Sequence, residues 1–153
     1  MQIPLNTPQN LPVKGTDLDV SSTETKNKRV LIIDDEPDML RLMKVILMNA
    51  GFDTATAISG ADGLRRLEIA RPDVILLDVM MPEADGFVIF EELRSITDIP
   101  IIFVSAKSEA DQTARVLEEG KAEFIAKPFH IDELVSRIKR VMAAAEKSYK
   151  HHF

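Results

Sequence analysis

Short apolar runs that alternate with helical patterns constrain the fold of this 153-residue chain more than any other feature. Three runs are rich in β-branched residues and are bounded by polar or turn residues, as buried strands usually are: residues 30–33, 74–77 and 101–104. Two weaker strand candidates cover residues 52–58 and 123–126. A continuous apolar strand needs cover on both of its faces, so the pattern predicts parallel strands between two layers of helices.

Apolar residues at helical spacing separate these strands. The first helical pattern has spacings of three and four and stops at Gly51; its members are Met39, Leu42, Met43, Ile46, Leu47 and Ala50. Pro37 suits its first turn, where the backbone N–H has no intrahelical partner. Further helices are predicted over residues 60–70, 87–95, 109–119 and 131–145. Five strand–helix alternations predict an α/β fold, a doubly wound five-stranded parallel sheet with helices on both faces.

Composition limits the class of protein and its division into domains. Residues 1–28 are rich in Pro, Asn, Thr and Ser without sustained periodicity, so we expect a flexible N-terminal extension there. One folded domain is expected over residues 29–146, followed by a short tail, 147–153. The absence of cysteine excludes disulfides and thiolate metal sites, and the net charge of −6 disfavours direct nucleic-acid binding. No apolar run is long enough to span a bilayer, and a cytoplasmic location is expected.

Polar side chains close four of the five predicted strands. Asp34 and Asp35 follow the first, Asp78 the third, Ser105 the fourth and Lys127 the fifth. The carboxyl ends of parallel strands meet at one edge of the sheet, where ligands bind in such folds. Three carboxylates in one cleft need a cation, and Mg²⁺ with oxygen ligands suits both them and a phosphoryl group. The ammonium of Lys127 and the hydroxyl of Ser105 could bind phosphoryl oxygens on the opposite side of the cleft. No histidine lies near Ser105 in the predicted fold, so an acyl-transfer triad is not expected.

Four motifs, in order and at strand ends, resemble the receiver domain of response regulators in two-component signalling. They are the acidic pair in "LIIDDEP", the segment "LLDVMMPEADG", the "SAK" after the fourth strand and the "KPF" after the fifth. The resemblance covers residues 29–145. It implies the CheY-like, flavodoxin-like (βα)5 fold with strand order 2-1-3-4-5.

The resemblance also implies roles for the residues of the acidic cleft. Asp78 would be the phosphoacceptor, taking a phosphoryl group from a phosphohistidine on a sensor histidine kinase or a histidine phosphotransfer protein. Asp35 would bind Mg²⁺ directly and Asp34 mainly through water, with Asp78 and the backbone carbonyl of Met80 as further ligands. Lys127 would pair with the phosphoryl group.

A conformational switch is implied at the last two strands. Ser105 would turn toward the phosphoryl group, and Phe124 stands where the family places its switch aromatic. The peptide between Lys127 and Pro128 resembles a cis bond of the family. The activated surface would comprise the fourth helix, fifth strand and fifth helix, which in some members forms a homodimer.

The segment "GKAEF" departs from the family, in which Gly-Ala-Asp-Asp often precedes the switch aromatic. Ala122 removes one acidic partner of that homodimer. Glu123 is still expected to pair with Arg137 or Arg140.

The leading function is therefore a Mg²⁺-dependent phosphorylation switch that is not an enzyme in the ordinary sense. One alternative is the receiver fragment of a DNA-binding transcription factor. Another is a Mg²⁺-dependent aspartyl phosphatase, although such enzymes carry Asp-x-Asp after the first strand and this chain has adjacent aspartates. Leu40, Val45 and Met48 lie outside the main apolar stripe of the first helix and are candidates for a kinase-docking patch.

Overall fold

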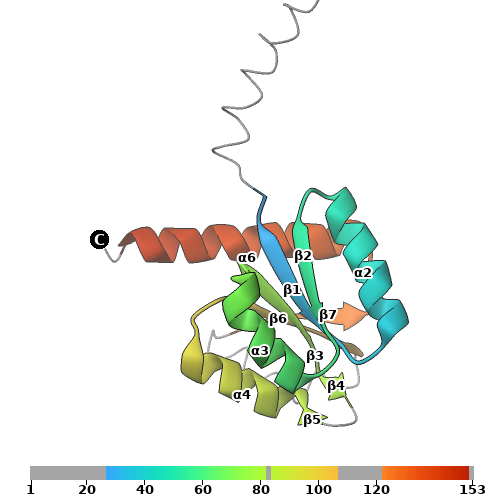
Figure 1. Cartoon of the computed structure of the whole chain (residues 1–153). Coiled ribbons are helices and arrows are strands. Elements are labelled where there is room, and N and C mark those ends of the chain that lie inside the picture. Colours follow the sequence, from blue (N-terminus) through green and yellow to red (C-terminus); the bar gives the residue numbers. More distant parts are fainter. Residues whose placement is uncertain (1–26, 82–83, 107–121, 152–153) are drawn as a thin grey trace, which may run out of the picture.

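Five parallel strands form the central sheet of the computed structural model, which describes residues 27–81, 84–106 and 122–151 (Figure 1). The strands are β1 (Arg29–Ile33), β2 (Asp53–Ala57), β3 (Val74–Asp78), β6 (Ile101–Ala106) and β7 (Glu123–Lys127). Their order across the sheet is β2-β1-β3-β6-β7, and every neighbouring pair is parallel. When only the five strands of this sheet are numbered along the chain, their order is 2-1-3-4-5, as predicted.

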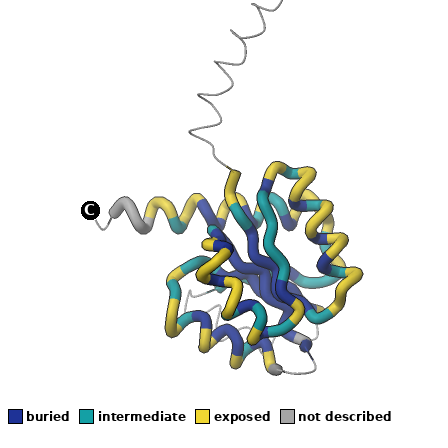
Figure 2. The backbone as a smooth tube through the Cα atoms, viewed as in Figure 1, coloured by how far each residue is buried: buried dark blue, intermediate teal, exposed yellow. Residues whose placement is uncertain are grey.

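Helices cover both faces of the sheet, as the continuous apolar strands require (Figure 1). On one face lie α2 (Pro37–Asn49) and α6 (Ile131–His151), whose apolar residues share a buried cluster with Val30 and Ile32. On the other lie α3 (Gly60–Ala70) and α4 (Gly86–Ile96), packed with Leu31 and Ile33. Figure 2 shows the buried strands in the middle and the exposed residues on the outer sides of these helices. The helix predicted over residues 109–119 lies outside the described residues.

The structure differs from the sequence prediction at element ends and at one small hairpin. Helix α6 continues to His151, beyond the predicted end at residue 145. Strands β4 (Met80–Met81) and β5 (Ala84–Asp85) pair antiparallel and were not predicted, because two-residue strands carry no measurable periodicity.

The prediction of which residues of α2 are buried was wrong at two leucines. Leu40 is buried with Met43 and Leu47, whereas 52% of Leu42 is exposed. A helix on a sheet buries only the side that faces the sheet, and the 3.6-residue period turns Leu42 away from it. The exposed apolar residues of α2 are therefore Leu42, Val45 and Met48, which we call the α2 patch.

A glycine allows α4 to begin against the end of β3. A Cβ on Gly86 would lie 2.6 Å from the Cα of Val79 and 2.9 Å from the carbonyl oxygen of Asp78. The N–H of Gly86 donates to the Val79 carbonyl at 3.1 Å, and the Asp85 carboxylate caps the helix by accepting from the N–H of Phe87 at 2.8 Å. The sequence Asp85-Gly86 thus fixes the loop after Asp78 to the first turn of α4.

Candidate functional site

The strand register brings two aspartates side by side at the carboxyl edge of the sheet. Ile33 pairs with Leu77, so Asp34 and Asp78 each occupy the next position on adjacent strands. Both are buried, with 4% and 5% of their surface exposed, and Asp35 beside them is partly exposed. One carboxylate oxygen from each of the three aspartates lies within 4.8 Å of the others. The predicted acidic cluster is therefore present.

Lys127 supplies the positive charge that the sequence predicted for this cleft. Its Nζ lies 3.8 Å from Oδ2 of Asp78 and 3.9 Å from Oδ2 of Asp34. These distances indicate electrostatic attraction and not tight charge-assisted hydrogen bonds, which are shorter. The peptide between Lys127 and Pro128 is cis, as the resemblance implied.

The carboxyl group of Asp34 has an unfavourable environment for its negative charge. Burial, above all, raises its pKa above the usual range, and the carboxylates of Glu36 and Asp35 add to the rise. Two groups lower the pKa of Asp34 without cancelling the rise. The N–H of Glu36 donates to Oδ1 of Asp34 at 2.9 Å, and the Lys127 ammonium attracts the carboxylate. Three clustered carboxylates, one of them costly to ionise, form a donor set that fits a hard divalent cation such as Mg²⁺.

Asp34→Asn is expected to stabilise the protein in the absence of Mg²⁺. The amide keeps an acceptor for the Glu36 N–H and removes a buried charge beside Asp35. At pH 7 the gain should be about 1 kcal/mol, or roughly 2–5 °C in Tm. A raised native pKa means that the ionised form destabilises the fold. That cost disappears as pH falls through the interval between the native and the ordinary pKa values, so the gain should shrink there.

Thermal unfolding of wild type and variant in EDTA measures this difference. Asp98→Asn serves as the control, because Asp98 is an exposed carboxylate that precedes β6 at the opposite end of the sheet. An Asp34→Asn protein less stable than wild type in EDTA at pH 7 would show that Asp34 is satisfied without a cation.

Ser105 and Phe124 lie on the side of the sheet that α3 and α4 cover. Side chains alternate along a strand, and Ser105 shares its side of β6 with Phe103, which packs in the cluster under α3 and α4. Phe124 packs against that same cluster. Ser105 is 1% exposed, and its hydroxyl has no hydrogen-bond partner among the described residues. Phe124 pairs with Phe103 and Ser105 pairs with Ala126, so the two predicted switch residues lie diagonally on one side of adjacent strands.

Two methionines of α2 lie beside the acidic cluster, and Met80 follows it along the chain. Met80 lies two residues past Asp78, in the β4–β5 hairpin. Met39 and Met43 line the same small cavity as Asp34 and Asp78, a role that the sequence did not reveal. The helical spacing of Met39 and Met43 predicted that both are core residues, but it gave no sign that they lie beside the aspartates.

Comparison with known protein families gives the same picture as the fold and the acidic cluster. The chain matches the model of the response regulator receiver domain over residues 30–139. The chain belongs to the response-regulator receiver family. As a receiver domain, it is a phosphoacceptor and not a conventional enzyme, which removes the aspartyl phosphatase alternative. The acidic cluster of Asp34, Asp35 and Asp78 is consistent with the receiver Mg²⁺ site and with phosphorylation-based signalling.

Curated relatives are longer regulators. The transcriptional regulatory protein PrrA of Mycobacterium tuberculosis is 39% identical over 121 residues, which are 78% of this chain and 52% of that protein. The DNA-binding response regulator MtrA of Mycolicibacterium smegmatis is 34% identical over 116 residues, 76% of this chain and 51% of that protein. The chain therefore spans about half the length of these relatives.

Solved receiver domains share the fold. The receiver domain of Francisella response regulator 1452 is 31% identical with a TM-score of 0.70, over 78% of this chain and 99% of that one. A receiver domain protein from Clostridium thermocellum is 28% identical with a TM-score of 0.73, over 78% and 97% of the two chains. In the described part of this chain, no helix is long and apolar enough to cross a membrane.

Proposed function

We propose that this receiver domain is a Mg²⁺-dependent switch that accepts a phosphoryl group on Asp78 from the phosphohistidine of a sensor histidine kinase or a histidine phosphotransfer protein. The observation that carries the proposal is the position of Lys127, whose Nζ lies 3.8 Å from Asp78 and 3.9 Å from Asp34 beside the three-carboxylate cluster. Asp78 thus belongs to the carboxylate set that would hold the cation and also lies near the Lys127 ammonium, and both positive charges would neutralise a transferring phosphoryl group.

The chemical step is an in-line displacement at phosphorus. An oxygen of Asp78 forms the new O–P bond while the P–N bond of the phosphohistidine breaks, and the electron pair of that bond stays on the imidazole nitrogen. Lys127 attracts the phosphoryl oxygens from one side. Asp34, Asp35, Asp78 and the carbonyl of Met80 would hold Mg²⁺, whose contribution when bound is to neutralise charge on these oxygens.

The switch step follows from the hydroxyl of Ser105. It is buried without a hydrogen-bond partner among the described residues, so it gains a bond by turning to donate to a phosphoryl oxygen. Phe124, which packs on the same side of the sheet, moves into the space that Ser105 leaves. Because Phe124 has no hydroxyl, packing alone stabilises the new position. The surface of β7, α6 and the helix predicted over residues 109–119 then changes, which is a population shift between two states.

A small phosphodonor tests the proposal without knowledge of the kinase. Incubation with acetyl phosphate and Mg²⁺ should add one phosphoryl group, detected by intact mass and by phosphate-affinity electrophoresis. The modification should be absent in EDTA. A gain that does not need Mg²⁺ would contradict the role of the acidic cluster.

The α2 patch of Leu42, Val45 and Met48 is the proposed docking surface for the phosphodonor protein. Each residue is more than half exposed, and their spacing of three places them on adjacent turns of one helix. Val45→Glu should reduce the rate of phosphotransfer from the cognate kinase about tenfold or more, because it places a charge in an apolar contact. Its phosphorylation by acetyl phosphate should be unchanged.

Radiolabelled phosphotransfer time courses measure this effect. Ile96→Glu is the matched control, since Ile96 is similarly exposed at the far end of α4. Equal transfer rates for wild type and Val45→Glu would place the docking surface elsewhere.

A second proposal concerns the output. The relatives PrrA and MtrA are named as a transcriptional regulator and a DNA-binding regulator, so the chain is a candidate for the receiver part of such a protein. In this chain Glu123 pairs internally, at 3.0 Å with Arg140 and 3.5 Å with Arg137, as the sequence predicted. A homodimer through β7, α6 and the helix predicted over residues 109–119 would have to compete with these internal pairs. The complete reading frame tests the first point, and sedimentation with and without phosphodonor tests the second.

A further inference from the structure

We propose that the open edge of β2 binds an extended segment of a partner protein, in which two acidic residues precede two apolar residues, as an additional antiparallel strand. This binding does not depend on phosphorylation at Asp78. Three features of the molecule support it: the backbone groups at the edge of β2, the groove that surrounds this edge, and the charged and apolar side chains on the two walls of the groove.

The outer edge of β2 has backbone groups that no strand of the sheet pairs with. Strand β2 is the last in the sheet order, and its N–H at Asp53 donates to the carbonyl of Lys28 on the side of β1. Backbone groups alternate in direction along a strand, so Thr54 and Thr56 direct their N–H and carbonyl groups away from β1. The sequence of β2 contains neither proline nor lysine, two residues with which natural edges avoid pairing. This edge can therefore accept a further strand.

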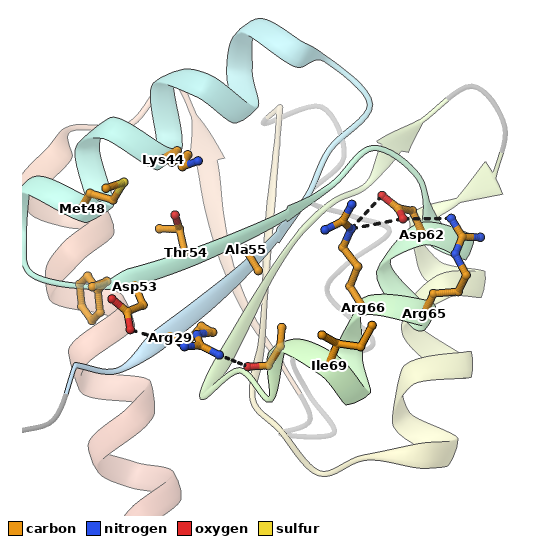
Figure 3. Close-up of a pocket in the computed structure, with 12 residues that line it drawn as sticks. Arg29, Lys44, Met48, Asp53, Thr54, Ala55, Asp62, Arg65, Arg66 and Ile69 are labelled. Atoms are coloured by element: carbon orange, nitrogen blue, oxygen red, sulfur yellow. Dashed lines mark hydrogen bonds and ion pairs between the residues drawn. The ribbon is translucent and has the colours of Figure 1, made fainter.

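A groove of about 660 Å³ surrounds the edge of β2 (Figure 3). Its walls come from helices on opposite faces of the sheet. Lys44 and Met48 of α2 line one wall, Arg66 and Ile69 of α3 line the other, and Thr54 of β2 lies between them (Figure 3). Because side chains alternate along a strand, those of an added strand would point in turn toward α2 and toward α3.

Each wall of the groove has one positive charge in excess. On α3, Arg65 lies 3.0 Å and Arg66 lies 3.3 Å from the same carboxylate, that of Asp62, so two cations share one anion. On α2, the exposed ammonium of Lys44 forms no ion pair with any residue that the structure describes. An added strand with one carboxylate directed toward each wall would balance both charges.

Apolar side chains lie nearer the other end of the groove. Met48 on α2 is 54% exposed, and Ile69 on α3 is 83% exposed. Both helices run back from the carboxyl ends of the strands, so these later residues lie toward the amino end of β2 and the cationic side chains toward its carboxyl end. Charge is balanced at the amino end, since Arg29 lies 3.6 Å from Asp53. This end of the groove therefore suits apolar side chains.

The order of charged and apolar side chains defines the partner segment. From Lys44 to Met48, and from Arg66 to Ile69, the helices rise about 5–6 Å, close to the rise of two strand residues, about 6.6 Å. Antiparallel pairing is the more stable per residue and is common at the edges of parallel sheets. In that direction two adjacent acidic residues would meet the cations, and the next two residues would cover the apolar side chains. A second copy of this chain is disfavoured, because its own groove would bring the same positive charge.

Amide hydrogen exchange with a synthetic peptide tests this inference. The probe is the capped peptide Thr-Asp-Glu-Val-Ile-Thr, added in saturating excess to the full chain. We expect the amides of Thr54 and Thr56 to exchange at least about fivefold more slowly with the peptide, because they become donors in a strand pair. The amide of Asp53, which bonds to Lys28 within the sheet, is the internal reference and should not change. The charge-reversed peptide Thr-Lys-Lys-Val-Ile-Thr should give no protection.

Lys44→Gln combined with Arg66→Gln tests the charges of the groove. We expect this protein to bind the fluorescently labelled acidic peptide about fivefold more weakly at low ionic strength, because one ion pair is lost on each wall. Fluorescence anisotropy measures the Kd. Lys139→Gln combined with Lys147→Gln is the matched control, since it removes the same charge from exposed positions on α6, and it should bind as the wild type does.

Protection of Thr54 and Thr56, with affinity lost only in the groove variant, supports binding at the edge of β2. A peptide that leaves the exchange of these two amides unchanged overturns it. Equal weakening in the α6 control also overturns it, because attraction to the charge of the whole protein would then explain binding. Protection that rises with protein concentration in the absence of peptide overturns it in favour of pairing between two copies.

Discussion

Asp78→Asn is expected to abolish phosphorylation of this receiver domain, by acetyl phosphate and by a kinase alike. The amide has no anionic oxygen to attack phosphorus, so no O–P bond forms at this position. The neutral isostere should fold normally, because it occupies the same volume beside Lys127 and Asp34. Intact mass after incubation with phosphodonor and Mg²⁺ should show no phosphorylated species above the background of the untreated protein.

Asp98→Asn is the control for a nonspecific effect of removing a carboxylate. It should be phosphorylated to the same extent as the wild type, since Asp98 lies at the other end of the sheet. An Asp78→Asn protein that still gains the phosphoryl group would assign the acceptor to another residue, and peptide mapping would then identify it.

Mg²⁺ is expected to raise the Tm of the wild-type protein, and Asp35→Ala is expected to remove the response. Binding to the native state alone stabilises it by about 2.7 kcal/mol at a ligand concentration of 100 Kd, which corresponds to roughly 6–12 °C for a domain of this size. The clustered oxygens of Asp34, Asp35 and Asp78 form a site only in the folded chain, because they come from two different strand ends. Alanine at Asp35 removes its oxygen ligands without burying a new polar group.

Differential scanning calorimetry with increasing MgCl₂ measures this response, with NaCl at matched ionic strength as the salt control. Asp98→Asn should respond as the wild type does. A wild-type protein whose Tm is indifferent to Mg²⁺ would mean that Lys127 alone balances the carboxylates.

The residues at the strand ends were predictable because a parallel sheet leaves little freedom in where they lie. Once β1 and β3 are neighbours in register, Asp34 and Asp78 must be adjacent, whatever the loops do. Lys127 follows by the same rule from β7, although only the structure shows that its Nζ reaches the two carboxylates.

Other features depend on information that no local pattern contains. Which side of α2 faces the sheet decides between Leu40 and Leu42, and the apolar sequence "MLRLM" permits either. The β4–β5 hairpin is too short for a period to be recognised. The burial of the Ser105 hydroxyl without a partner among the described residues depends on neighbours from other strands and helices.

The close approach of Gly86 to Asp78 and Val79 has a mechanical consequence. Backbone atoms of Asp78 and Val79 lie 2.6–2.9 Å from the place of a Cβ on Gly86, so no side chain separates the start of α4 from the end of β3. A displacement of the peptide after Asp78 would therefore press directly on the backbone of the first turn of α4. We therefore expect the start of α4 and the residues after Asp78 to be displaced together.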